Sequence, residues 1–283
     1  MNKIPVMGTL VVNHLQIQNL LDSVDYPVEH FVIFNNNGKG ENTTDLDSIA
    51  ATPHPFIENL KVCHLPDNVG VSCGWNLIIK SFINAPYWII CNDDVSFEKG
   101  FLEEMYETAQ DSEIGLIHGD EGDYYLGSWC VFLIKDWVIQ RLGLFDENMT
   151  PAYGEDTDYT MRMRSLYFQA GGKGDPRKES KNLEWPKRII GLKKRFYHGG
   201  ELSGEEESYY KYGKQVSKHD EELGKKLLHS NYANFEYMTE KWGEDWRVQV
   251  PWWAPFDKKD IPLSYTTFDL GFLRSKTTQE PFK

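Results

Sequence analysis

The stretch YWIICNDDV, residues 87–95, is a short apolar run that stops abruptly in an amide and two adjacent carboxylates. Apolar runs of this length, rich in aromatic and β-branched residues, are typical of a buried strand in a parallel sheet. In open α/β sheets, ligands bind beyond the carboxyl ends of such strands. Asp93 and Asp94 would repel each other there and lose hydration unless a cation or hydrogen-bond donors compensated them. The stretch therefore predicts a divalent-metal site that holds a phosphorylated ligand, and a solvated turn or a helix cap is the alternative.

The composition limits the class of protein. The chain has 283 residues, enough for one large α/β domain with or without an extension. A hydrophobic content of 40% and a charged content of 26% are ordinary for a globular protein. The formal net charge of -13 disfavours a nucleic-acid binder, which needs Lys and Arg to neutralise phosphates. No apolar run approaches the roughly 20 residues that span a bilayer and residues 1–5 show no signal peptide, so we expect a cytoplasmic protein without a transmembrane segment.

The cysteines show no metal-binding or redox pattern. They are Cys63, Cys73, Cys91 and Cys130, and no two of them form a CxxC pair. We expect reduced, buried thiols in preference to disulfides or a zinc site.

Apolar runs alternate with helix-spaced segments through most of the chain. The predicted strands are 4–13, 30–34, 60–65, 87–91, 114–118, 127–134 and 196–200, and helical spacing appears after residue 17, near Ser72, over 101–109 and from Thr157 onward. This alternation predicts an α/β fold with a mostly parallel sheet and helices on both faces.

An acidic cluster begins the last of these helices, in the order Gly154-Glu155-Asp156-Thr157-Asp158. Backbone N–H groups and the helix dipole at a first turn favour the charged form of a carboxylate. The alternatives are an exposed capping role and a simple i,i+4 pair between Asp158 and Arg162.

Two later segments leave alternatives open. Residues 171–195 are basic and glycine-bearing, which fits either a mobile loop that contacts a diphosphate or an anionic acceptor, or, as we prefer, a solvated face. The aromatic residues near the C-terminus either cap the core or form a wall for sugar rings: Trp242, Trp246, Trp252, Trp253 and Phe256.

Taken in order, the motifs resemble those of nucleotide-sugar-dependent glycosyltransferases of the GT-A fold, specifically family-2-like inverting enzymes. The matching elements are Asn13, Asn35-Asn36, the run Asn68 to Asn76, Asn92-Asp93-Asp94, Gly127, Gly143-Leu144-Phe145-Asp146, Gly154-Glu155-Asp156, Tyr197-His198-Gly199 and Glu240-Lys241-Trp242-Gly243. The resemblance covers residues 4–243 and implies a GT-A catalytic core at 1–200 with a helical and aromatic extension at 201–283.

The resemblance also implies the roles of the acidic residues and of one histidine. Asp94 is implied as the direct ligand of Mn²⁺ or Mg²⁺, and His198 as the residue that completes the metal shell. Asp156 is implied as the base that removes the proton of an acceptor hydroxyl, and Glu155 is the alternative base. Asn92 departs from the family pattern, because relatives usually carry an acid at this position.

A nucleotide-sugar donor and a glycan or glycoprotein acceptor are the partners that the resemblance implies. The implied donor-binding residues are Asn13, Asn35, Asn36, Asn68, Gly74, Asn76, Asn92 and Asp93. In relatives an aspartate after the second strand binds uracil, and Asn35 or Asn36 offers both a donor and an acceptor at that place. This departure from the family's aspartate leaves the base of the donor open, and among the nucleotides we favour UDP over GDP or dTDP.

Two other classes of protein remain as alternatives. A non-catalytic module that binds carbohydrate or nucleotide sugar is favoured by Asn92 and disfavoured by the intact Glu155-Asp156 pair. A sugar-phosphate nucleotidyltransferase would need a glycine-rich basic loop after its first strand, and residues 13–16 contain no glycine.

Overall fold

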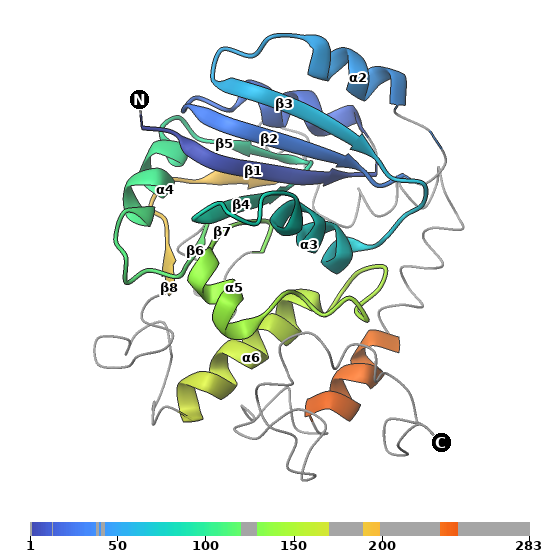
Figure 1. Cartoon of the computed structure of the whole chain (residues 1–283), viewed down its shortest axis with the longest axis vertical. Helices are drawn as coiled ribbons and strands as arrows, with labels where there is room; N and C mark the ends of the chain where they lie inside the picture. The colour runs from blue at the N-terminus through green and yellow to red at the C-terminus, as the bar shows by residue number, and fades with distance from the viewer. Residues whose placement is uncertain are drawn as a thin grey trace.

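The protein is a mixed α/β structure whose sheet is flanked by helices (Figure 1). The computed structural model describes residues 2–12, 14–37, 40, 43–119, 129–169, 189–198 and 233–242. The elements are β1 (Ile4–Val11), η1 (His14–Gln16), α1 (Ile17–Asp22), β2 (Val28–Asn35), α2 (Thr43–Ala51), β3 (Ile57–His64), α3 (Val71–Ser81), β4 (Tyr87–Asn92), β5 (Val95–Phe97), α4 (Phe101–Ala109), β6 (Leu116–His118), β7 (Val131–Lys135), α5 (Asp136–Leu142), α6 (Glu155–Gln169), β8 (Ile189–Gly191), β9 (Phe196–His198) and a helix at 233–242.

The main sheet has seven strands in the order β3-β2-β1-β4-β7-β6-β8. All of its pairings are parallel except the two that β7 makes with β4 and β6. The prediction of a mostly parallel sheet is therefore confirmed. The chain moves outward from β1 to β3 and then returns to place β4 on the other side of β1. This reversal of strand order between β1 and β4 is where open α/β sheets bind ligands.

The strand register brings the carboxyl ends of four strands to one edge. Val11 lies opposite Asn35, and Asn35 lies opposite His64 on the next strand. On the other side of β1, Leu10 lies opposite Asn92. Polar residues that are far apart in sequence thus share one edge of the sheet, which we call the carboxyl edge.

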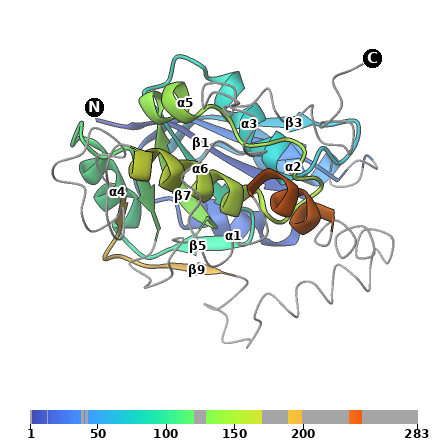
Figure 2. The ribbon, with the colours of Figure 1, turned by 90° about the horizontal axis from the view of Figure 1, so that it is seen from below.

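Side-chain alternation divides the core into two layers. Met7 and Ile89 pack with α1, α2 and α4 on one face, whereas Val6, Trp88 and Ile90 pack with α3, α5 and α6 on the other. A strand with both faces covered is apolar throughout, which explains the unbroken run at 87–91. Figure 2 shows the sheet between α3 and α5 on one side and α1 with the β5–β9 pair on the other.

Helix α3 lies unusually close to β1. A Cβ on Gly74 would stand 2.3 Å from Cδ2 of Leu10, and a Cβ on Gly8 would stand 2.7 Å from Cγ2 of Ile78. Close packing accounts for Gly74, and its implied contact with the donor stays a prediction.

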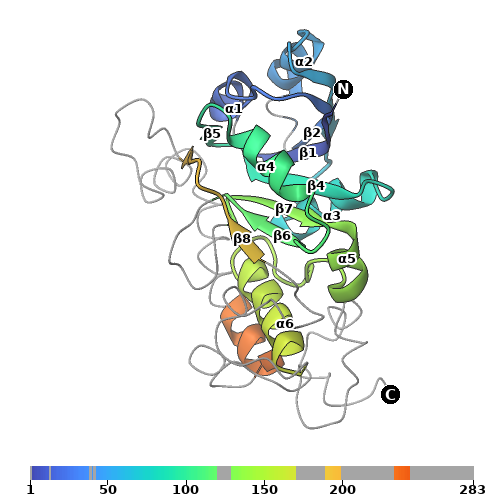
Figure 3. The same cartoon turned by 90° about the vertical axis from the view of Figure 1, so that its left-hand side faces the viewer.

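The helix at 233–242 packs beside α6 (Figure 3). Its buried side chains Tyr237, Met238 and Trp242 form a small core with Met149 and Met161. This helix falls in the predicted extension, whose boundary at residue 200 stays a prediction. Trp246, Trp252, Trp253 and Phe256 lie outside the described residues.

The end of the basic stretch 171–195 is fixed to the core. The backbone N–H groups of Lys193 and Lys194 each donate to Glu104 at 2.9 Å, and that of Arg195 donates to Glu98 at 2.9 Å. Residues 189–191 form β8, and the exposed side chains of residues 193–195 agree with the preferred solvated face. Residues 171–188 lie outside the described residues.

All four cysteines are free thiols. Cys91 is buried as expected, but Cys63 is exposed because β3 is the edge strand of the sheet. Within the described residues, no helix combines the length and the apolar character that crossing a bilayer requires.

Candidate active site

Asn36 anchors the loop that precedes α3. Its backbone N–H donates to the carbonyl of Val11 at 2.7 Å, at the end of β1. Its side chain donates to Oδ1 of Asn68 at 3.3 Å and accepts from the N–H of Val69 at 2.8 Å. The same Oδ1 of Asn68 accepts from the N–H of Gly70 at 2.9 Å. Both asparagines therefore shape this loop, and their contact with a donor stays a prediction.

Asn35 is oriented by residues that sequence reasoning missed. Its Nδ2 lies 3.1 Å from Nδ1 of His64, and Nε2 of His64 lies 2.9 Å from Oδ1 of Asp47. With the proton on Nε2, His64 donates to Asp47 and accepts from the Asn35 amide. This chain of bonds holds the amide of Asn35 in one orientation at the carboxyl edge. Asn13, the predicted partner from β1, lies outside the described residues.

The loop before α3 contacts the segment that leads to the acidic cluster. Gly70 has a φ of +82°, and a Cβ there would stand 2.8 Å from the carbonyl oxygen of Pro151. The N–H of Val71 donates to that same carbonyl at 2.7 Å, and Oγ of Ser72 donates to the carbonyl of Met149 at 3.1 Å. Hydrogen bonds thus lead from β2 to a point four residues before Glu155.

Asn76 braces the same region from within α3. Its side chain donates to the carbonyl of Phe145 and accepts from the N–H of Phe145, both at 2.9 Å. It also donates to Glu147 at 2.9 Å. These hydrogen bonds explain why a buried position holds an asparagine, and the role of Asn76 in donor binding stays a prediction.

A second connection joins the end of β4 to α6. The N–H of Asn92 donates to the carbonyl of Cys130 at 2.8 Å. The neighbouring Trp129 packs edge-on against Tyr159 of α6, with 5.8 Å between the ring centroids. The Asn92–Asp94 turn is therefore linked through Trp129 and Cys130 to α6, the helix that begins with the acidic cluster.

The strand pair β5–β9 brings His198 close to Asp94. Asp93 and Asp94 form the turn between β4 and β5, and both are partly buried. In the antiparallel register, His198 lies directly opposite Val95, the residue after Asp94. Sequence reasoning found the β9 segment but missed β5, because only pairing with β9 separates Val95–Phe97 from the preceding strand. Within the described part of the chain, no group of three His, Cys, Asp or Glu side chains gathers as a ready-made metal site.

The two carboxylates that begin α6 are both desolvated. Glu155 is 7% exposed, and its Oε2 has no hydrogen-bond partner among the described residues. Burial, together with the adjacent Asp156, raises the pKa of Glu155 to about 8. Burial also raises the pKa of Asp156, against hydrogen bonds from Thr157 that lower it. The backbone N–H groups at the helix start lower the pKa of Asp156 as expected, but desolvation outweighs them, so the net shift is upward.

These pKa shifts divide the two carboxylates by role. A pKa near 8 keeps Glu155 mostly protonated at neutral pH, which favours Asp156 as the base and leaves Glu155 as the alternative. Asp156 accepts hydrogen bonds from the N–H and, at 3.1 Å, from Oγ1 of Thr157. A carboxylate with a raised pKa accepts a proton more readily than an ordinary one. The arrangement is therefore suited to general-base chemistry at Asp156.

The raised pKa of Glu155 predicts how stability depends on pH. The folded protein binds the Glu155 proton more tightly than the unfolded chain, whose value is the ordinary 4.5. This contribution to stability is fully present below pH 4.5 and is lost as pH rises toward about 8. Its slope is at most about 1.4 kcal/mol per pH unit. We expect Glu155→Gln to flatten the fall in unfolding free energy over this range in urea titrations, and parallel curves for both proteins would contradict the desolvated carboxyl.

Asp158 has a structural role. It is fully buried and accepts from Nε of Arg162 at 3.0 Å, from Nζ of Lys241 at 2.7 Å and from Nε1 of Trp242 at 2.9 Å. The i,i+4 pair with Arg162 is confirmed as part of a larger buried network. Both of its carboxylate oxygens already accept hydrogen bonds from Arg162, Lys241 or Trp242, so Asp158 is unsuited to act as a base.

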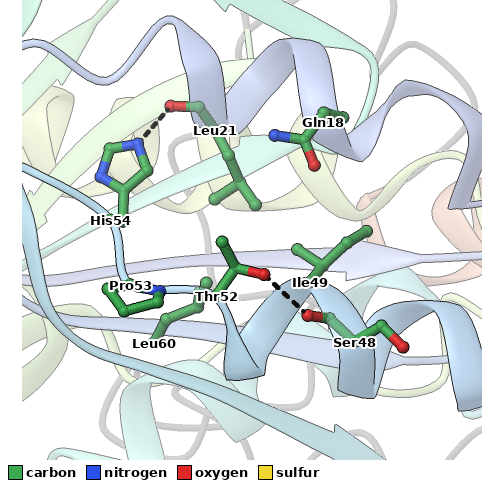
Figure 4. Close-up of a pocket in the computed structure, with 8 residues that line it drawn as sticks. All are labelled: Gln18, Leu21, Ser48, Ile49, Thr52, Pro53, His54 and Leu60. Atoms are coloured by element: carbon green, nitrogen blue, oxygen red, sulfur yellow. Dashed lines mark hydrogen bonds between the residues drawn. The ribbon is translucent and has the colours of Figure 1, made fainter.

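A cavity of about 270 Å³ lies elsewhere, between α1, α2 and β3 (Figure 4). Nε2 of His54 lies 3.0 Å from the carbonyl of Leu21, and Oγ1 of Thr52 donates to the carbonyl of Ser48 at 3.1 Å. None of the residues that line it belongs to the predicted site. Because its polar groups already bond within the protein, we assign this cavity no ligand.

No family model matches the chain. A galactofuranosyl glycosyltransferase of Leishmania donovani is 22% identical to this chain, in a match that covers 58% of this chain and 53% of the relative. The chain is similar to glycosyltransferases. It spans about half the length of this curated relative.

Solved glycosyltransferases show a weak likeness in fold. The mannosyltransferase PcManGT from Pyrobaculum calidifontis, in complex with GDP-Man and Mn²⁺, has a TM-score of 0.48 and 16% identity, over 67% of this chain and 54% of that one. S. aureus TarS in complex with UDP-GlcNAc has a TM-score of 0.49 and 12% identity, over 96% of this chain and 78% of that one.

Proposed function

We propose that the chain is a metal-dependent glycosyltransferase of GT-A type that transfers a sugar from a nucleotide diphosphate to a hydroxyl group and inverts its anomeric configuration. One observation carries the proposal: hydrogen bonds and ring packing link the polar ends of β2 and β4 to α6 and to the segment before it, and α6 carries Glu155 and Asp156. The sequence similarity to a galactofuranosyl glycosyltransferase supports the reaction class.

The donor nucleotide would lie along the ends of β1, β2 and β4. Asn35, held in one orientation by His64, can offer both an acceptor and a donor to a nucleobase. Such a pair of groups fits uracil and purines alike, so it does not select the base, and we keep UDP as the preferred nucleotide. TarS binds UDP-GlcNAc, whereas PcManGT binds GDP-Man, so the identity of the base needs a direct test.

The residues beside β5 fit a divalent cation. Asp94 supplies a hard oxygen ligand, and the β5–β9 register brings the backbone of His198 next to it. Mg²⁺ and Mn²⁺ commonly bind through one or two protein groups together with substrate phosphates. The metal, when bound, would neutralise the charge of the leaving diphosphate. PcManGT was solved with Mn²⁺, which supports this choice.

Asp156 would act as the base. It removes the proton from the acceptor hydroxyl as that oxygen attacks the anomeric carbon. The bond between this carbon and the diphosphate oxygen breaks on the opposite face, and its electron pair leaves with the nucleotide diphosphate. The uncharged Glu155 next to Asp156 adds no repulsion toward the approaching hydroxyl oxygen.

The proposal is tested by mixing the wild-type protein with UDP-sugars and GDP-sugars in Mn²⁺ and measuring release of the nucleotide diphosphate. We expect release with one nucleotide class, and ¹H NMR should show a β-linked product from an α-linked donor. Release of pyrophosphate from a nucleoside triphosphate and a sugar phosphate would instead identify a nucleotidyltransferase. Tight binding of nucleotide sugars without transfer or hydrolysis would identify a binding module.

A further inference from the structure

We propose that Asn234, on the helix at 233–242, is a positioning residue for the carboxylates of Glu155 and Asp156. This inference rests on the proposed function in assigning those carboxylates to catalysis. The Nδ2 group of Asn234 donates to the carbonyls of Ala152 and Tyr153, at 2.9 Å and 2.8 Å. Asn234 is 1% exposed, so water does not compete for these bonds.

The backbone that Asn234 holds has an uncommon conformation. Tyr153 has a φ of +75° and Gly154 has a φ of +100°, immediately before Glu155. A residue with a large side chain rarely adopts a positive φ, and it persists there only when its surroundings over-determine it. A Cβ on Gly154 would stand 3.7 Å from Cβ of Asn234, so Asn234 also packs against this turn. Its two hydrogen bonds fix the direction in which the chain enters α6.

The rest of the helix fixes both sides of this turn. Nζ of Lys241 lies 2.7 Å from Asp146, before the turn, and 2.7 Å from Asp158, after it. Tyr237 donates to Asp146 at 2.7 Å, and Trp242 donates to Asp158 at 2.9 Å. Glu155 and Asp156 thus lie between two anchor points that the same helix supplies.

The ion pairs of Lys241 with Asp146 and Asp158 hold the helix in place, so a substitution at Asn234 can be tested without detaching the helix. Burial works to raise the pKa of Asp146, but Lys241 and the hydrogen bonds from Lys241 and Tyr237 hold it well below its usual range. Removing Lys241 would strand two buried carboxylates and threaten the fold. Asn234 is neutral, so its substitution removes two hydrogen bonds and leaves no charge unpaired.

The contacts of this helix predict that a change at Asn234 lowers the rate of catalysis and leaves donor binding unchanged. Its donor groups reach residues 146–158, whereas the predicted nucleotide-binding residues Asn35, Asn36 and Asn92 lie at the ends of β2 and β4. Loosening the turn at residues 152–154 should therefore displace the base more than the nucleotide, because the two bonds of Asn234 go to this turn rather than to the strand ends.

We test this with Asn234→Leu, which keeps the side-chain volume and removes the donor. We expect kcat to fall on the order of 10- to 100-fold, the scale of a small misplacement of a reacting group. The KM for the nucleotide sugar should stay unchanged. Amide hydrogen exchange should become faster in peptides covering residues 150–157 and stay unchanged in peptides covering β1 and β2. Glu236→Gln, an exposed change on the same helix, is the matched control and should alter none of these quantities.

An unchanged kcat, or a loss of kcat accompanied by an equal loss of donor affinity, would overturn the positioning role. If the wild-type protein transfers no sugar, the proposed function fails, and hydrogen exchange still decides whether Asn234 holds residues 150–157. Should Asn234→Leu fail to fold, Asn234→Ser keeps one donor, and an intermediate fall in kcat is then the supporting result. Full activity of Asn234→Ser with unchanged exchange would refute the proposal.

Discussion

Replacing Asp156 with asparagine is expected to lower turnover of the nucleotide sugar by about 10²- to 10⁴-fold, the range typical of a lost general base. Asparagine keeps the size of the side chain and an oxygen that can accept the bonds from Thr157. It cannot take up the proton of the acceptor hydroxyl. Donor affinity, measured by calorimetry with the nucleotide diphosphate, should therefore remain that of the wild type.

Glu155→Gln is the matched control for this experiment. Glutamine resembles the protonated form that the raised pKa assigns to Glu155 at neutral pH, so its turnover should stay much closer to wild type. If Asp156→Asn stays within a fewfold of wild type while Glu155→Gln loses activity, the base is Glu155. An α-linked product from an α-linked donor would exclude a single direct displacement by either residue.

The second large effect is expected at the turn between β4 and β5. Asp94→Ala should be nearly inactive and yet folded, because Asp94 is only partly buried and contributes no side chain to the apolar core. EDTA should abolish turnover of the wild-type protein, and Mn²⁺ or Mg²⁺ should restore it. Full activity in chelator would remove the metal from the mechanism.

His198 supplies a graded test of the same site. His198→Ala should weaken Mn²⁺ binding by roughly 10- to 100-fold, the scale of a lost contact at a metal site. Glu58→Gln removes one exposed charge from the edge strand β3 and serves as the control. A metal titration of His198→Ala that overlays the wild type would assign the histidine to structure.

The sequence by itself determined the architecture. Alternating apolar runs and helix-spaced segments indicate which positions face a core. This local pattern does not depend on which helices and strands pack against each other. The helix Phe101–Ala109 was predicted with its observed bounds, and the acidic cluster was placed on the first turn of α6, where the structure has it. The strand Tyr87–Asn92 and its polar end were predicted from residue types alone.

Only the tertiary structure decided the pKa values of the polar residues and the groups that they contact. Burial, which depends on the whole fold, raises the pKa of Glu155 to about 8 and outweighs the effect of the helix start on the pKa of Asp156. Asp158 forms an ion pair with Lys241, which follows it by more than 80 positions in the chain. The approach of His198 to Asp94 requires the β5–β9 pairing. Hydrogen bonds and desolvation depend on which groups are close in space, whereas the sequence gives only the order of residues along the chain.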